Sequence, residues 1–338
     1  MSTYNCSHCG SEVLEGMYKC PQCGVVFTDE KGRFDKIIGF FESKTKMNLT
    51  GNAWKTLGWF GAANAAVILS ITLISGGSLF YLTPFLLIIG SVFPLLSLLF
   101  SKYLAKKAHG IRIIQKGHFH NGYEADLYEL VERLGKRAGL NETPEVGLYE
   151  SEDMNAFATG MNRNNSMVAF STGLLTKMSE EEIAAVAAHE MGHIANGDMI
   201  TMSIVQSAVN AFVLLITIPL YLAQFFSFFS ENVGLLAYVI ISAIRFLVTG
   251  VLMFLGNLIV KAFSRKREYE ADTLAARLIS RDSMISALKT LSMENNPLPK
   301  GQKDYAVLKI NAPAGLAEIF STHPSLEKRI QRLQSLKD

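Results

Sequence analysis

Long uncharged stretches alternate with charged ones along this chain of 338 residues. Residues 56–101 contain no Asp, Glu, Lys, Arg or His, whereas one membrane-spanning helix needs only about 20 such residues. Gly76, Gly77 and Ser78 interrupt the stretch near its middle. We therefore predict a first transmembrane hairpin at 56–101, with helices at 57–75 and 79–100.

A second apolar block begins at Met199. Residues 199–230 carry no charge, and 232–260 contain only Arg245, so two further spans are expected. A charge near the centre of a spanning helix costs about 2.5 to 3.5 kcal/mol. This second hairpin, at 199–260, is thus predicted to be transmembrane or more shallowly membrane-associated. Arg245 is expected to reach the headgroups or to pair with a backbone carbonyl.

Basic residues gather on one side of these four predicted spans. They precede the first span and follow the second and the fourth, whereas 75–80 and 226–232 contain no Lys or Arg. Because positive charge marks the cytoplasmic side, both termini and the segments between the hairpins are expected in the cytoplasm. No secretory signal is expected, since a polar segment precedes the first apolar run. The net charge of +2 gives no indication of nucleic-acid binding.

All four cysteines lie within the first 23 residues, in two Cys-x-x-Cys pairs that are each followed by glycine. Such pairs present four thiolates to one zinc ion, whereas disulfides are disfavoured in the reducing cytosol. We predict a structural zinc in a small zinc ribbon at 1–30, joined to the first span by a basic linker at 31–55. A protein partner is favoured for this ribbon over nucleic acid. The predicted ligands are Cys6, Cys9, Cys20 and Cys23.

A helix with a clear start signal follows Met178. Ser179 and Glu182 have capping-box spacing, and a cluster of glutamates opposes the positive end of the helix dipole. His189 and His193 lie four residues apart, so they project from one face and can bind one zinc ion. Glu190, beside the first histidine, is placed to activate a water molecule at that metal.

A catalytic zinc also requires a third protein ligand. Glu268, Glu270 and Asp272 lie on a second predicted helix that continues through Leu278. Their spacing does not choose among the three, which could equally form a solvated charged face. Because the His-Glu-x-x-His pattern also arises by chance, the residues around it decide the interpretation.

These residues resemble the HtpX family of membrane-bound zinc endopeptidases, which is related to the CAAX prenyl proteases within the gluzincins. The resemblance rests on His-Glu-Met-Gly-His at 189–193 and Glu-Tyr-Glu-Ala-Asp at 268–272, separated by an apolar hairpin. Segments 155–160, 171–175 and 322–325 are also similar. The cysteine-rich amino terminus departs from the commonest members.

The resemblance implies that Glu268 is the third zinc ligand and that Asp272 supports a ligand histidine. His323 is a candidate oxyanion donor, or simply the residue before a carboxy-terminal helix. An edge strand is implied to pair with extended substrate. The resemblance points to Asn155, Ala156, Phe157 and Ala158 as its substrate-binding residues, although the sequence alone could equally describe an ordinary packed strand.

The implied fold is an α+β zincin-type metalloprotease domain with four transmembrane helices and the amino-terminal ribbon. The catalytic domain is divided into a first part at 102–198 and a second part at 261–338. Short strands are expected at 145–150, 155–161 and 167–171, with a hairpin loop between the last two.

The implied function is zinc-dependent hydrolysis of peptide bonds in misfolded or damaged membrane proteins, at the cytoplasmic face of a bacterial-type inner membrane. Protein substrates and the lipid bilayer are the expected partners. An inactive zinc-ribbon scaffold is disfavoured by the intact His-Glu-x-x-His motif. Intramembrane proteolysis is disfavoured because charged residues flank the motif helix, and a CAAX-type prenyl-protein protease because its closed chamber needs more spans.

Overall fold

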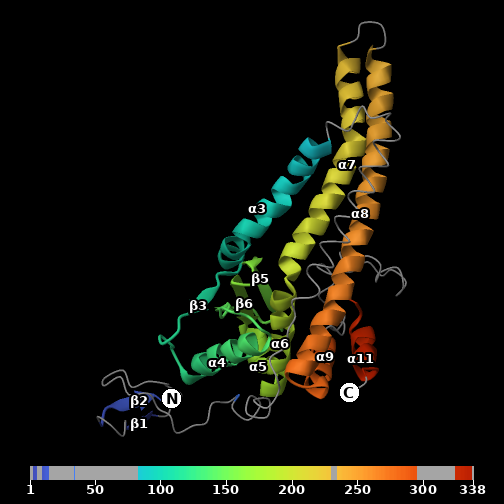
Figure 1. Ribbon diagram of the computed structural model, residues 1–338. Helices are drawn as coiled ribbons and strands as arrows, with labels where there is room; N and C mark the ends of the chain where they lie inside the picture. Colours follow the sequence, from blue (N-terminus) through green and yellow to red (C-terminus); the bar gives the residue numbers. More distant parts are fainter. Residues whose placement is uncertain are drawn as a thin grey trace, which may run out of the picture.

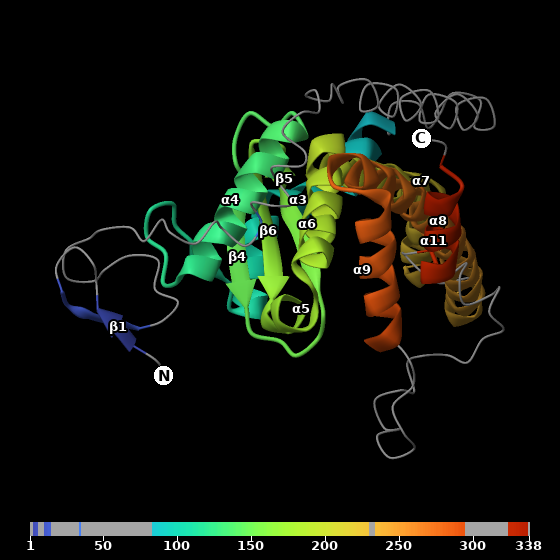
Figure 2. The ribbon, with the colours of Figure 1, turned by 90° about the horizontal axis from the view of Figure 1, so that it is seen from below.

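The computed structural model describes residues 3–5, 10–14, 34, 83–229, 234–294 and 324–336. A small antiparallel hairpin of β1 and β2 lies near the amino terminus, and a mixed sheet with helices forms the main body (Figures 1 and 2). The elements are β1 (Thr3–Asn5), β2 (Glu12–Leu14), α3 (Thr83–His109), β3 (Arg112–Ile114), α4 (Gly122–Arg137), β4 (Glu145–Tyr149), β5 (Ala156–Asn162), β6 (Asn165–Ser171), α5 (Thr172–Lys177), α6 (Glu180–Asn196), α7 (Asp198–Phe228), α8 (Gly234–Leu278), α9 (Arg281–Glu294) and α11 (Leu326–Gln334).

The sheet has the strand order β3-β4-β6-β5. β4 and β6 are parallel, whereas β3 and β5 pair antiparallel at the two edges. Since side chains alternate along a strand, β6 contributes to two cores. Val168 and Phe170 join the large core with α4, α6 and α9, while Met167 and Ala169 face a smaller cluster that includes Ala105 of α3. The three predicted strands are thus present, and β5 is one of the two edge strands.

Helix α3 extends from the second predicted span into the main body. Its first part is lined with exposed apolar side chains, of which Phe93 is 79% exposed. Its last turns lie against the sheet, where Lys102 Nζ and Lys106 Nζ lie 2.8 and 2.7 Å from the two carboxylate oxygens of Glu145. One continuous helix therefore joins an apolar surface to the folded sheet.

Helix α6 begins at the predicted capping box. Ser179 accepts from the Glu182 amide, and the Glu182 carboxylate accepts from the Ser179 amide. The same carboxylate accepts hydrogen bonds from Ser286 and Thr290 of α9, at 2.7 and 2.6 Å. At Gly192, a Cβ would lie 3.1 Å from Cα of Ala271 on α8. Glycine there lets α6 and α8 pack backbone against backbone.

Helices α7 and α8 form a long antiparallel pair, in which the end of α7 and the start of α8 lie farthest from the sheet (Figure 1). Within the described residues, these two are the helices long and apolar enough to cross a membrane. They coincide with the second predicted hairpin. α8 continues without a break through Lys261 into the main body.

Arg245 makes an aromatic contact that the sequence did not predict. Its guanidinium lies 4.3 Å from the centroid of the Tyr221 ring on α7, which makes the pairing a cation–π contact between helices. The first predicted span, the basic linker, the four cysteines and His323 lie outside the described residues.

Candidate metal centre

Two histidines of α6 face one another across one helical turn. The His189 and His193 rings lie 4.7 Å apart, nearly perpendicular, and their Nε2 atoms are 3.2 Å apart. This arrangement follows from their spacing of four residues, which places both on the same side of a helix. The surrounding small residues of α6, including Ala188 and Gly192, are buried and allow α8 to approach.

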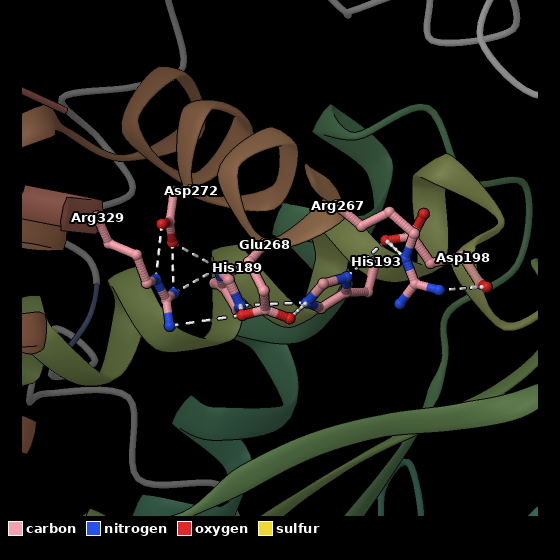
Figure 3. A network of polar contacts seen from close by, with 7 residues as sticks. All are labelled: His189, His193, Asp198, Arg267, Glu268, Asp272 and Arg329. Atoms are coloured by element: carbon pink, nitrogen blue, oxygen red, sulfur yellow. Dashed lines mark hydrogen bonds and ion pairs between the residues drawn. The ribbon is translucent and has the colours of Figure 1, made fainter. Parts of the chain in front are cut away.

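Glu268 of α8 completes the cluster (Figure 3). Its Oε2 lies 3.6 Å from His189 Nε2 and its Oε1 lies 3.4 Å from His193 Nε2. One ligand atom from each of the three residues falls within 4.8 Å of the others. Glu270, in contrast, is half-buried and has Lys266 as an ion-pair partner at 3.9 Å. Of the three acidic residues that the sequence left open as the third ligand, Glu268 is the one that lies in this cluster.

A carboxylate holds the far nitrogen of each histidine. Asp272 Oδ1 lies 2.9 Å from His189 Nδ1, and Asp198 Oδ2 lies 2.6 Å from His193 Nδ1. Because a carboxylate accepts, each Nδ1 carries a hydrogen and the Nε2 of the neutral ring is left with its lone pair. Two lone pairs and a carboxylate then converge on one point, an arrangement that suits a divalent cation such as zinc.

Two arginines complete the network in Figure 3. Arg329 of α11 donates from Nε to Asp272 Oδ2 at 2.8 Å and from Nη2 to Asp272 Oδ1 at 2.5 Å. Its Nη1 lies 3.4 Å from Glu268 Oε2. Arg267 of α8 is the ion-pair partner of Asp198, with its Nε 3.4 Å from Asp198 Oδ2.

The network shifts the protonation of its members. Burial disfavours the charged imidazoles, but Asp198 and Glu268 raise the pKa of His193 to about 10. Asp272 and Glu268 likewise raise the pKa of His189 against the effect of burial. Burial acts to raise the pKa of Asp272, yet hydrogen bonds from Arg329 and His189 lower it. A metal ion must therefore displace protons from the histidines to bind here.

Glu190 lies on the same turn as His189, with 8% of its surface exposed. Burial raises the pKa of its carboxyl group, although His189 and His193 act in the opposite direction. The backbone amide of Ala158 hydrogen-bonds to the same carboxylate. Glu190 therefore connects the metal cluster to the edge strand β5.

Sequence reasoning missed three members of this site. Asp198, Arg267 and Arg329 are all buried or nearly so, with side chains 6, 13 and 8% exposed. Arg329 is 57 residues from Asp272 along the chain, and no short motif connects them. The sequence did offer one signal for Asp198 and Arg267. They are charged residues that flank the apolar hairpin on its two sides, where a buried and unpaired charge is costly, so each should have a partner.

A histidine pair on one helix and a glutamate from another, set against the edge strand of a mixed sheet, define the class of zinc metalloproteases. The chain belongs to peptidase family M48, whose match extends over residues 122–337. Its substrates are accordingly proteins.

Several known proteins are similar to most of this chain in sequence. Protease HtpX of Tolumonas auensis is 40% identical over 295 residues, covering 82% of this chain and 98% of that protein. Protease HtpX of Acinetobacter baylyi is 41% identical over 262 residues, covering 74% of this chain and 84% of the relative. Protease HtpX homolog of Bacillus licheniformis is 39% identical, with 75% and 84% covered.

Among solved structures, the crystal structure of S. mikatae Ste24p is similar, with a TM-score of 0.51 and 20% sequence identity. The likeness covers 81% of this chain and 62% of that one, and it concerns the fold.

Proposed function

We propose that this metalloprotease binds its catalytic zinc through His189, His193 and Glu268, and that Glu190 is the general base. The observation that carries the proposal is the position of Glu190. Its carboxyl group is buried close enough to His189, His193 and Glu268 for their charges to shift its pKa, and the backbone of Ala158 on β5 also acts on it. It is therefore placed between the metal cluster and the strand along which an extended peptide would lie.

Zinc, when bound, supplies a Lewis acid that polarises the scissile carbonyl and acidifies water. Glu190 takes the proton of the attacking water and delivers it to the nitrogen of the leaving amine. Because burial raises the pKa of Glu190, the carboxylate is a stronger base than an exposed glutamate. Asp272 holds the ring of His189 in the orientation that directs Nε2 inward.

We propose β5 as the substrate-binding strand. The Ser171 amide donates to the Asn155 carbonyl at 2.9 Å, so Asn155 and Phe157 direct their backbone groups toward β6. The backbone groups of Ala156 and Ala158 alternate with these and point away from β6, where the Ala158 amide is directed at Glu190 and the remaining groups are available to a substrate. A substrate in extended conformation can pair there as an added strand. Small side chains at both positions leave room for it.

A second, structural zinc bound by Cys6, Cys9, Cys20 and Cys23 is also part of the proposal. Paired Cys-x-x-Cys knuckles support it. The ribbon would dock a protein partner. His323 remains the proposed oxyanion donor, since it precedes α11, which carries Arg329 into the site.

We further propose that α7 and α8 cross the cytoplasmic membrane, with the metal site on the cytoplasmic side. Glu268 follows Lys261 by seven residues on one continuous helix, which corresponds to about 10 Å at 1.5 Å per residue. By the same rise, Arg245 lies about 24 Å beyond Lys261, in the outer half of a hydrocarbon core of about 30 Å. Its guanidinium can then reach the opposite headgroups along the Tyr221 ring.

A site at this height can reach cytoplasmic loops and frayed ends of membrane proteins but not segments buried in the bilayer. Extended backbone is the form that strand addition requires, which favours unfolded segments as substrates. A role in quality control of damaged or misfolded membrane proteins follows from this preference.

The variant Glu190→Gln tests the proposal. A carboxamide cannot accept the proton, whereas the three ligands are untouched. We expect zinc content to stay normal while cleavage of an unstructured peptide is lost. Glu181→Gln, at an exposed position on the same helix, is the matched control. Full activity of the zinc-loaded Glu190→Gln enzyme would refute the assignment.

A further inference from the structure

The partner of His193 lies at the first residue of a membrane-type helix. Gly197, with φ of 70°, ends α6, and Asp198 begins α7 immediately after it. The Asp198 side chain is 6% exposed and its Oδ2 lies 2.6 Å from His193 Nδ1. Gly197 separates the two helices, and the Asp198 carboxylate contacts His193 of the helix before it (Figure 3).

Arg267 ties this carboxylate to the other helix of the hairpin. Its Nη1 donates to the backbone carbonyl of Asp198 at 3.0 Å, and its Nε lies 3.4 Å from Asp198 Oδ2. Arg267 directly precedes Glu268 on α8. Asp198 and Arg267 therefore join the two ends of the hairpin. Asp198 also contacts the proposed ligand His193, and Arg267 adjoins the proposed ligand Glu268.

We infer that Asp198 is a positioning residue for His193 and that the Asp198–Arg267 pair, here called the hairpin clamp, links zinc binding to the packing of α7 on α8. The inference rests on the proposed role of His193 as a zinc ligand. The clamp resembles the Asp272–Arg329 pair that holds His189, but it is looser, because Arg267 Nε has no hydrogen-bond partner among the described residues and Arg267 hydrogen-bonds to the Asp198 backbone carbonyl. Each ligand histidine thus has its own carboxylate, and each carboxylate has its own arginine.

The chemistry of the clamp is positional. A carboxylate on Nδ1 fixes the tautomer and the ring plane, and loss of such a partner weakens metal binding by about 10- to 100-fold. Arg267 lies at ion-pair distance from the buried carboxylate and offsets its charge, and its hydrogen bond to the Asp198 carbonyl holds the backbone that carries it. A shift of α7 against α8 would separate Arg267 from Asp198 and release the ring of His193.

The first test measures zinc affinity of the full-length enzyme by competition with a chelator of known affinity. Asp198→Ala should bind zinc about 10- to 100-fold more weakly than the wild type. Asp198→Asn should fall between them, because its carbonyl oxygen still accepts from Nδ1 but lacks the charge. Lys266→Gln is the control, because Lys266 lies on the same helix with its side chain 72% exposed.

The second test examines the link through the hairpin. Arg267→Gln should weaken zinc binding less than Asp198→Ala does, and the double variant should be no weaker than Asp198→Ala alone, because Arg267 acts through Asp198. If the effects of the two single variants simply add, the clamp does not act as a unit and the coupling is wrong.

A merely structural role predicts a different pattern. In that case the thermal midpoint of the zinc-free protein would fall while zinc affinity stayed constant, and this result in a folded Asp198→Asn or Asp198→Ala variant would overturn the inference. The cobalt-loaded enzyme offers a readout independent of cleavage, since altered visible absorption in Asp198→Asn would report a changed ligand geometry at the metal.

Failure of the inference can be told from failure of the proposed function. An inactive Glu190→Gln enzyme together with unchanged zinc affinity in both Asp198 variants would reject the clamp alone. An active Glu190→Gln enzyme with weakened zinc binding in the Asp198 variants would reject the proposed base and leave the clamp in place.

Discussion

Arg329 and Asp272 form a two-pronged ion pair in the interior, with nitrogen–oxygen distances of 2.8 and 2.5 Å. Both side chains are buried, at 8 and 2% exposed. The pair joins α11 to α8 and stands directly behind His189, so a residue near the carboxy terminus supports a ligand of the metal site.

Removing Arg329 should therefore damage both stability and zinc binding. Loss of one partner from a buried ion pair costs about 3 to 5 kcal/mol, because the other charge remains buried. We expect Arg329→Ala to lower the thermal midpoint and the zinc content. Arg329→Lys should rescue poorly, since an ammonium group lacks the planar fork. Gln331→Ala, at an exposed position on the same helix, should behave like the wild type; equal midpoints for both alanine variants would contradict the prediction.

Glu268→Ala should lose zinc and activity together, as expected for a ligand. Glu270→Ala is the matched control, because Glu270 lies two residues away and has Lys266 as a partner outside the metal cluster. Metal analysis of the purified variants distinguishes them. Normal zinc content in Glu268→Ala would transfer the ligand role to Asp272 or Glu270.

How far the sequence could predict this site depends on the distance over which each signal acts. The capping box and the histidine pair are local, because helix geometry alone places residues three or four apart together. The third ligand could be narrowed only to three acidic residues, Glu268, Glu270 and Asp272. The choice among them depends on how α8 is rotated against α6. Gly192 lets α6 and α8 pack closely, but nothing in the sequence indicated this role.

Arg267 and Arg329 could not be assigned to the site from the sequence, for a related reason. Arg329 meets Asp272 only because α11 packs against α8, and spacing along the chain does not encode that contact. The strands, in contrast, were predictable from their alternation and from the turn at 162–165, which the structure places between β5 and β6. That β5 is an edge strand needed the sheet order.

Glu182 should make stability depend on pH. Burial acts to raise the pKa of its carboxyl group, but hydrogen bonds from Thr290, Ser286 and Ser179 lower it overall. A folded pKa below the unfolded value gives stability that is present above the unfolded pKa and lost as pH falls through the folded one.

Glu182→Ala should therefore destabilise the protein by about 2 kcal/mol at pH 7, on the scale of hydrogen bonds to a charged group. The difference from wild type should shrink as the pH falls below about 4. Glu182→Gln should lose less, because glutamine also completes a capping box. Glu181→Ala, at an exposed position, provides the baseline, and thermal unfolding in detergent measures all four. A pH-independent difference would contradict the role given to the charge.

Zinc stoichiometry should reveal two kinds of site. We expect two zinc ions per chain, of which one is exchangeable with phenanthroline-type chelators and one is held by four thiolates. Cys6→Ser combined with Cys20→Ser should reduce the number to one and leave basal cleavage of an unfolded peptide. Loss of both ions together would show that the cysteine pairs are integral to the catalytic fold.

Topology can be tested by cysteine labelling from each side of the membrane, in a background whose four natural cysteines are replaced by serine. Ser179→Cys should react only from the cytoplasmic side, because α6 carries the metal site. Phe229→Cys, which is 67% exposed at the far end of α7, should react only from the opposite side. Reaction of position 179 from outside would overturn both the orientation and the substrate class.

The order of the ligands along the chain has a consequence for biogenesis. His189 and His193 precede the α7–α8 hairpin, and Glu268 follows it. A nascent chain that has emerged only as far as α6 has two ligands and no third. The ligand set closes only after the hairpin has been synthesised and has folded back on itself. If that folding occurs in the bilayer, as proposed, the enzyme acquires its proteolytic activity at the membrane and not before, so newly made cytosolic proteins are spared during its own synthesis.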